Sequence, residues 1–288
     1  MSYNISILVM YALTPCHAGS GSALGVVDLP IQRERHTNYP LIYSSGIKGA
    51  FRANFNRFER KLNDGVKFNK LTESIFGEKG SDGDGNKGGY AGAISVSDAK
   101  ILAFPMRSSV APFVWITCPT VLGRLNRDLK LAGKSEIVIN TELSSDEEAI
   151  ALNCDLRGDI LIEDYQVNVK EGKIESDLFK QTKRLLLVSD KVFDYGVSHC
   201  TQINAQIAIN QESGSTDIGS LRYQEELPSD TLMYCTVAWS GSRDDDNKLS
   251  ADNVKKFIQD TISKYIQVGG DETLGRGIFE LTWIGEKE

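Results

Sequence analysis

The sequence predicts an α+β protein in which strands and amphipathic helices alternate along the chain. Residues Ser6 to Leu13 are mostly apolar, include β-branched side chains and stop before a Thr-Pro pair, which is typical of a strand. Apolar residues recur every three or four positions from Ser44 to Asn63 and from Ala251 to Ile266, which predicts two amphipathic helices. Further strands are predicted at Ala93 to Pro105 (two short ones), Thr231 to Trp239 and Ile278 to Trp283. This order fits a split βαβ, ferredoxin-like βαββαβ core with insertions.

The segments between these elements show weaker patterns. Helices are expected at Leu71 to Phe76, Thr120 to Ala132, Ser176 to Leu187 and Ser189 to Tyr195. The acidic, mixed stretch from Glu136 to Ile162 is expected to be peripheral. We predict one domain over residues 1–288, with insertions at about 14–43, 77–92 and 133–175.

A long β-hairpin with a polar tip is predicted at about residues 201–230. Gln202 to Asn210 alternates between polar and apolar residues, and Gln211 to Gly219 is a turn rich in Gly, Ser and Thr. Leu221 to Glu226 then leads to a proline, so the two arms can pair.

Composition excludes several classes of protein. With 41% hydrophobic and 25% charged residues the chain is an ordinary globular protein. No apolar run reaches the length that spans a membrane, and residues 1–4 lack the basic start of a signal peptide, so we expect a cytoplasmic protein with no membrane partner. The five cysteines are scattered and show no CxxC pair, which argues against a metal cluster or a disulfide framework.

The net charge of −7 argues against a general nucleic-acid coat protein, but the charges are unevenly distributed. From Ile31 to Lys70 there are nine basic and three acidic residues, an excess of six. The acidic excess lies in Glu142 to Asp164 and Asp244 to Asp246. One basic face on an acidic body suits a protein that binds a polyanion along one track, although a solvated helix face would also explain part of it.

The most informative stretch precedes and opens the first helix. A loop after the first strand carries His17, several glycines and an isolated Asp28. The small-residue turn at 44–46 then opens a helix with Lys48 and Arg52 on one face. Free amides and the positive end of the helix dipole attract anions. The pattern indicates a phosphate site beside an acid and an imidazole, and an ordinary loop with a helix start would give the same spacing.

Two loops are rich in glycine. The first, at 77–92, repeats the acidic start of an EF-hand loop from Asp82. However, Lys87 stands where that loop needs glycine and Ala93 where it needs a bidentate glutamate, so we exclude calcium. The second loop, Gly269 to Gly277, reads GGDETLGRG and precedes the last predicted strand.

Five segments carry a resemblance to a known family. They read HAGSGSALGVVDLPIQRE, YSSGIKGAFR, YAGAISVSDAKILAFPMRSSVAPFVWITCP, LRYQEELPSDTLMY and GGDETLGRGIFELTW, and together they span nearly the whole chain. The chain resembles the backbone subunit of type III-B (Cmr) CRISPR effector complexes, in the RAMP superfamily of RNA-binding proteins. The glycine-rich loop is common to many RAMP proteins, whereas the first and middle segments are more specific to this subunit.

The resemblance implies a set of partners. Copies of the chain would stack into a filament along one CRISPR RNA, together with other Cmr subunits and a single-stranded target RNA. The hairpin would act as a thumb that displaces a guide nucleotide at regular intervals. The residues expected to hold guide phosphates are Ser45, Lys48 and Arg52 at the helix start and Gly270, Gly275, Arg276 and Gly277 in the second glycine-rich loop.

The resemblance also implies an endoribonuclease in which Asp28 is required for cleavage with a divalent metal, Mg²⁺ or Mn²⁺. At a splayed nucleotide the ribose 2′-hydroxyl can attack its own phosphate in line, so the protein supplies position, charge compensation and an acid–base partner. Asp28 is the expected metal ligand or base, and His17 the acid–base group or phosphate contact. Glu225 or Glu226 at the end of the hairpin would assist.

Each of these residues also has a structural interpretation. His17 could hydrogen-bond to backbone, Lys48 could be a helix-surface charge, and Arg276 a loop charge. Arg107 could be structural or contact RNA, and the sequence leaves that open. Asp28 has no cationic partner or capping role in its neighbouring sequence, which favours a functional role.

Two other functions compete with the nuclease. A purely architectural guide-binding subunit would not need an acid in this loop, so Asp28 argues against it. A metal-independent CRISPR-RNA processing nuclease is disfavoured by the middle segment and by the loop that carries Asp28. Because the site would form only when guide and target pair in a filament, we expect the isolated subunit to be weakly active or inactive.

Overall fold

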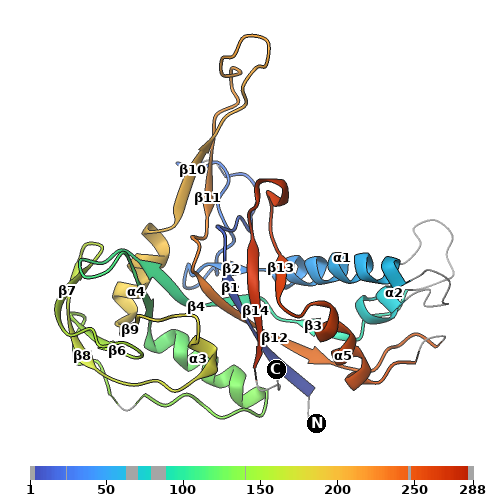
Figure 1. The fold of residues 1–288 in the computed structure, drawn as a ribbon, viewed down its shortest axis with the longest axis horizontal. Coiled ribbons are helices and arrows are strands. Elements are labelled where there is room, and N and C mark those ends of the chain that lie inside the picture. The colour runs from blue at the N-terminus through green and yellow to red at the C-terminus, as the bar shows by residue number, and fades with distance from the viewer. Residues whose placement is uncertain are drawn as a thin grey trace.

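The computed structural model describes residues 4–23, 25–62, 71–78, 89–139, 141–245 and 248–284, with backbone only at 59–62. Within these ranges twelve strands join one mixed sheet, and two more form a separate antiparallel pair. Figure 1 shows the sheet running through the body and the strand pair projecting far from it. The calcium-like segment from Asp82 lies outside the described residues.

Four antiparallel strands form the centre of the sheet. They lie in the order β14 (Ile278–Ile284), β1 (Asn4–Ala12), β12 (Leu232–Trp239) and β4 (Ala99–Met106). Three short strands border them, namely β13 (Tyr265–Gln267) on β14, β2 (Leu41–Ile42) on β4 and β3 (Ile94–Val96) on β12. Helix α1 (Ser44–Leu62) follows β2, and α5 (Ala251–Thr261) follows β12.

Strand β1 is buried on both faces. Ile7 and Val9 belong to one apolar cluster, whereas Leu8 and Met10 belong to a second, and all four are fully buried. Because successive side chains of a strand point to opposite faces, this nearly continuous apolar run serves two cores. The second cluster contains Phe51 and other side chains of α1 and α5, so both helices pack on one face of the sheet.

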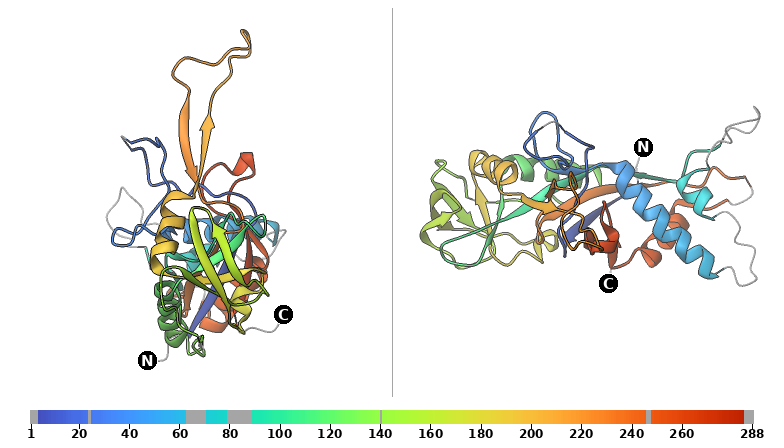
Figure 2. Two further views of the ribbon diagram at one scale, coloured as in Figure 1. Left: turned by 90° about the vertical axis from the view of Figure 1, so that its left-hand side faces the viewer. Right: turned by 90° about the horizontal axis from the view of Figure 1, so that it is seen from above.

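The other half of the molecule continues the same sheet. Beyond β4 it adds β5 (Val114–Thr117), β9 (Leu185–Val188), β6 (Glu148–Ala151), β8 (Tyr165–Glu171) and β7 (Gly158–Ile162). The remaining helices are α2 (Leu71–Phe76), α3 (Pro119–Leu131), η1 (Asp177–Phe179), α4 (Asp190–His199) and η2 (Glu272–Leu274). Figure 2 shows this half beside the α1 half, with the projecting pair rising from the middle.

Three sequence-based predictions are wrong. The stretch predicted helical at 176–187 contains η1 and most of the strand β9. All four residues of β9 are apolar and buried, and such a short run in a sequence does not distinguish a helix from a strand. The helix predicted to reach Ile266 ends at Thr261, and Ile266 instead lies in β13. The stretch at 136–162 is not peripheral, since β6 pairs with both β8 and β9 in the sheet.

The projecting pair consists of β10 (Gln202–Gln206) and β11 (Arg222–Glu226), with Gln202 opposite Glu226 and Gln206 opposite Arg222. The connection between the strands carries exposed aliphatic side chains, namely Ile207, Ile209, Ile218 and Leu221. No helix in the described part of the chain is long and apolar enough to cross a membrane.

Replacing Ile150 by Ala tests whether the 148–171 strands belong to the core. Ile150 is fully buried between β8 and β9, so we expect the free energy of unfolding to fall by about 2–5 kcal/mol. Denaturant unfolding measures this loss against Val138→Ala, whose side chain is 72% exposed and whose replacement is expected to cost less than about 0.5 kcal/mol. Equal effects of the two substitutions would contradict the assignment.

Candidate functional site

The outer edge of β11 is covered by residues 28–31. Alternate residues of an antiparallel strand turn their N–H and C=O groups away from the partner strand, and here Tyr223 and Glu225 do so. The Tyr223 carbonyl accepts hydrogen bonds from the Asp28 and Leu29 amides, each at 3.1 Å, and the Glu225 amide donates to the Leu29 carbonyl at 3.0 Å. Leu29 and Gln224 form a parallel bridge, so the segment runs alongside β11 like a third strand.

The carboxylate of Asp28 is held by this contact. Its Oδ2 accepts a hydrogen bond from the Tyr223 amide at 2.7 Å, while the residue as a whole is exposed. Among the described residues, no hydrogen bond or ion pair to Oδ1 is found. The neighbouring sequence therefore held no partner for Asp28 because its partner lies 195 positions away.

His17 is anchored on the same edge. Its Nδ1 lies 2.7 Å from the Glu225 carbonyl, which can only accept, so Nδ1 carries the proton of the neutral ring. The other nitrogen lies against Gly19, where an added Cβ would stand 2.6 Å from Nε2. The anchors of His17 and Asp28 are two residues apart on β11, ~7 Å along the strand.

Glu225 joins the Asp28 loop to the hairpin and to α4. Its Oε1 lies 2.6 Å from Arg33 and accepts from the Thr201 hydroxyl at 2.8 Å, and its Oε2 accepts from the Ile31 amide at 3.0 Å. Arg33 also donates to the Val197 carbonyl at 2.9 Å. Only 7% of Glu225 is exposed, so both carboxylate oxygens serve protein partners in a buried setting.

Glu226 joins the hairpin to the second glycine-rich loop. It is fully buried, with Oε1 3.1 Å from Arg276 Nε and Oε2 accepting from the Asn204 amide group at 2.6 Å. Gly277 has φ of 72°, and an added Cβ would stand 1.9 Å from the Val268 carbonyl, so only glycine fits there. The Gly270 amide donates to the His17 carbonyl at 2.9 Å, which places this loop against the His17 segment.

The start of α1 is partly satisfied by the protein itself. The Ser44 amide donates to Asp98 Oδ1 at 2.7 Å, and the Gly46 and Ile47 amides donate to the Tyr43 carbonyl. Ser45 is exposed. Most of the amides that the sequence pattern assigned to a phosphate therefore already have acceptors, so an anion here would depend chiefly on side chains.

Lys48 and Arg52 lie in different settings on α1. Burial, and then the charge of Arg52, lowers the pKa of Lys48, and no carboxylate among the described residues pairs with it. Such a cation gains from an incoming anion. Arg52 donates from Nη1 to the Gly77 carbonyl at 2.8 Å and so fastens α1 to the end of α2.

Asp28, His17, both glutamates and the second glycine-rich loop thus converge on the base of the hairpin, from segments far apart in the sequence, whereas Ser45, Lys48 and Arg52 lie on α1. In Figure 1 the loop after β1 and the loop between β13 and β14 flank the lower ends of β10 and β11. The sequence did not single out Arg33, Thr201 or Tyr223, because each acts through a contact with a residue more than twenty positions away.

Asp28 is the carboxylate of this site that keeps an oxygen without a partner among the described residues. No group of three His, Cys, Asp or Glu side chains suited to a metal ion occurs among the described residues. Mg²⁺ is commonly held by one or two carboxylates together with substrate phosphates and water. One free oxygen on an exposed Asp28 fits that mode, with nucleic acid supplying the other ligands.

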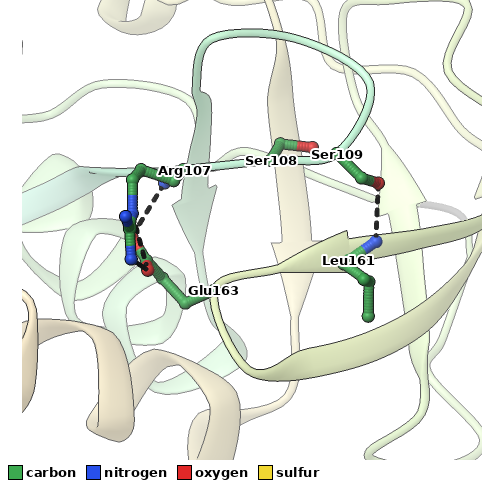
Figure 3. A pocket seen from close by; sticks show the side chains of 5 residues that line it. All are labelled: Arg107, Ser108, Ser109, Leu161 and Glu163. Carbon is green, nitrogen blue, oxygen red and sulfur yellow. Dashed lines mark hydrogen bonds and ion pairs between the residues drawn. The ribbon is translucent and has the colours of Figure 1, made fainter.

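A hollow lies between the end of β4 and strand β7. Arg107 and Glu163 bind each other on one side of it, with contacts of 2.7–3.1 Å, and on the other side Ser109 accepts from the Leu161 amide at 3.0 Å (Figure 3). The hollow of about 250 Å³ is lined by Arg107, Ser108, Ser109, Leu161 and Glu163. Arg107 therefore pairs with Glu163 while its side chain stays 84% exposed.

The thiols do not contribute a nucleophile. All five cysteines are free, and Cys16, the one in the His17 segment, is fully buried. Burial, with a smaller effect from Glu226, raises the pKa of Cys16 to about 12, so it stays protonated and unreactive at neutral pH.

The fold and these segments define the class of protein. The chain belongs to the RAMP superfamily, whose model matches residues 9–280. The CRISPR system Cmr endoribonuclease Cmr4 of Pyrococcus furiosus is 37% identical to it over 294 residues, covering 95% of this chain and 93% of that protein. The Cmr4 subunit of the CRISPR system of Saccharolobus solfataricus is 25% identical, covering 96% of this chain and 95% of that protein.

Solved structures agree with these relatives. Oligomeric Cmr4 from Pyrococcus furiosus superposes with a TM-score of 0.66 at 28% identity, covering 99% of this chain and 100% of that one. A chain of a type III-B Cmr-beta complex bound to cognate target RNA has the same fold, with a TM-score of 0.75 at 22% identity and 98% of each chain covered.

Gly19→Ala tests how His17 is held. The added methyl group would clash with Nε2 and push the imidazole ring away, which would break the bond to the Glu225 carbonyl. The neutral ring should then lose its preference for the Nδ1–H tautomer. Long-range ¹H–¹⁵N correlation spectra resolve the tautomer, and the chain has only three histidines to assign. Gly25→Ala, with no atom closer than 4.0 Å to the added carbon, is the control. An unchanged spectrum in Gly19→Ala would refute the close approach.

Proposed function

We propose that this chain is a repeated guide-RNA-binding subunit of a type III-B effector complex and that it cleaves the target RNA paired with the guide. Its relative from Pyrococcus furiosus is named an endoribonuclease and has been solved as an oligomer. The observation that carries the proposal is the exposed Asp28 carboxylate, fixed at the hairpin base beside His17. The chain works in the cytoplasm with copies of itself and other Cmr subunits.

The fold suits that role. The strand order β14-β1-β12-β4, with α1 and α5 packed on one face, supports assignment of these elements as a ferredoxin-like core. The β10–β11 hairpin is the thumb. Its exposed aliphatic side chains favour contact with a partner surface such as an unstacked base, because exposed apolar groups gathered on one element commonly mark an interaction site.

Guide phosphates run along a track from the start of α1 to the second glycine-rich loop. Lys48, which has no acid partner among the described residues, provides the main charge, with Ser45 beside it. Gly275, where an added Cβ would meet no atom within 4 Å, lets backbone approach the RNA closely, while Gly270 and Gly277 fit the loop against His17 and Val268. Arg276 is 31% exposed beyond its bond to Glu226 and contributes a second cation, whereas Arg52 mainly holds Gly77.

Cleavage proceeds by attack of a ribose 2′-hydroxyl on the adjacent phosphorus at a displaced nucleotide. The 2′-O–P bond forms, the P–O5′ bond breaks, and the proton of the 2′-hydroxyl is passed on while the 5′-oxygen gains one. The protein binds the RNA in the in-line geometry, which alone supplies much of the acceleration. Asp28 serves as base or holds a divalent cation, Mg²⁺ or Mn²⁺, which when bound offsets charge on the phosphate.

His17 and the two glutamates have different tasks. His17 keeps its Nδ1–H on the Glu225 carbonyl, so Nε2 accepts a proton when the ring is neutral, and donates one or binds a phosphate once the ring is protonated. Glu225 and Glu226 are buried and bonded on their oxygens to protein groups, so we assign them to positioning rather than to proton transfer.

Asp28→Asn separates the nuclease from an architectural subunit. The amide keeps an acceptor for the Tyr223 N–H but loses the charge, so cleavage of a guide-complementary RNA by the reconstituted complex should fall about 100-fold or more while target binding stays within about twofold. Removal of divalent cations should abolish cleavage by the wild type. Asp155→Asn, an exposed acid elsewhere, is the control. If the regular cuts persist in Asp28→Asn, the chain is a scaffold and the nuclease lies in another subunit.

Lys48→Met tests the phosphate track. Loss of one phosphate contact should weaken binding of CRISPR RNA and lower the slope of log affinity against log salt by about one. Fluorescence anisotropy over a range of KCl concentrations measures both quantities. Lys130→Met, at the exposed end of α3, should leave the slope unchanged. The same slope in both variants would show that Lys48 does not contact a guide phosphate.

A further inference from the structure

We propose that β11 positions Asp28, and that the backbone N–H of Tyr223 determines which carboxylate oxygen is free to act as base or metal ligand. The inference rests on the proposed role of Asp28 and adds to it a group that no side-chain comparison would single out. It means that the hairpin and the Asp28 loop move as one unit, so the place of cleavage follows the place of the hairpin.

The first argument is the pairing of the strand edge. Tyr223 uses both backbone groups outward, since its carbonyl accepts from the Asp28 and Leu29 amides and its amide donates to Asp28 Oδ2. An unpaired strand edge is normally open to any extended segment. Here residues 28–31 occupy it, and the acid is the first residue of that segment.

The second argument is the division of labour between the two oxygens. An exposed aspartate ordinarily turns freely about two side-chain bonds. The 2.7 Å bond from the Tyr223 amide fixes Oδ2 and so stops this rotation. The other oxygen, Oδ1, then points in one direction. Reactivity depends steeply on such direction, because displacement of a reacting group by about 1 Å can cost about 100-fold in rate.

The third argument is the lock on the segment. Glu225, two residues after Tyr223, binds the Ile31 amide at 3.0 Å and Arg33 at 2.6 Å. Arg33 in turn donates to the carbonyls of Val197 and Asn38, at 2.9 and 2.8 Å. A slip of residues 28–31 along β11 would break a largely buried ion pair and leave the buried Glu225 carboxylate without its counterion, which is disfavoured. Asp28 therefore cannot shift independently of the hairpin.

Tyr223→Pro tests the N–H directly. Proline removes the donor, and because this N–H points away from β10 no bond between β10 and β11 is lost. Tyr223→Ala, which truncates the same exposed side chain and keeps the N–H, is the reference. In the free chain, hydrogen–deuterium exchange at the Leu29 and Ile31 amides should be about tenfold faster in the proline variant than in the alanine variant.

In the assembled complex, the cleavage rate constant should be ~10- to 100-fold lower in Tyr223→Pro than in Tyr223→Ala, with target binding equal within about twofold. Equal exchange and equal cleavage in the two variants would overturn the inference. Asp28→Asn keeps the acceptor for the N–H, so its exchange should match the wild type while its cleavage is lost.

These variants distinguish the two proposals. If Asp28→Asn is inactive but the proline and alanine variants cleave equally, the positioning role fails and the proposed function stands. If Asp28→Asn cleaves at the wild-type rate, both fail. If circular dichroism shows that Tyr223→Pro is unfolded, Arg33→Met is tested instead. This variant removes the ion pair with Glu225 that locks the same segment. Wild-type exchange and cleavage in Arg33→Met would then overturn the inference.

Discussion

The arrangement of the site depends on the pairing of residues 28–31 with the outer edge of β11. This pairing brings a loop near the start of the chain onto a hairpin about two hundred positions later, and it satisfies an edge that would otherwise stay open. Two hydrogen bonds then place the candidate functional groups, one from the Tyr223 amide to Asp28 and one between His17 and the Glu225 carbonyl. Both groups are thus oriented by backbone, whose geometry changes little when side chains are exchanged.

Two buried acids on β11 hold the surrounding segments in place. Glu225 pairs with Arg33 on the side of the Asp28 loop, and Glu226 pairs with Arg276 on the side of the second glycine-rich loop. Burying a carboxylate is costly unless it is paired and hydrogen-bonded, and both are. Removing either arginine would leave a buried carboxylate without its counterion. The two ion pairs therefore hold the Asp28 loop and the second glycine-rich loop to β11. The result is a firm base from which the hairpin projects (Figure 1).

Two groups of the candidate site keep capacity for further ligands. Asp28 has one oxygen without a partner among the described residues, and Lys48 has no acid beside it there. Both are groups that an RNA phosphate, with or without a cation, would complete. This is consistent with activity that arises in the assembled complex, as we propose, and with the relative from Pyrococcus furiosus, which has been solved as an oligomer.

The sequence by itself determined the elements with strong periodicity. The apolar run of β1 and the spacing of Phe51 and Phe55 specify a two-faced strand and an amphipathic helix, because these patterns depend only on local geometry. It also singled out His17 and Asp28. Only the tertiary structure decided that 185–188 is a strand, since a short buried run takes its form from its neighbours. It likewise decided that Glu225 and Glu226 hold loops and that Tyr223 orients Asp28, because those contacts join residues that no local pattern relates.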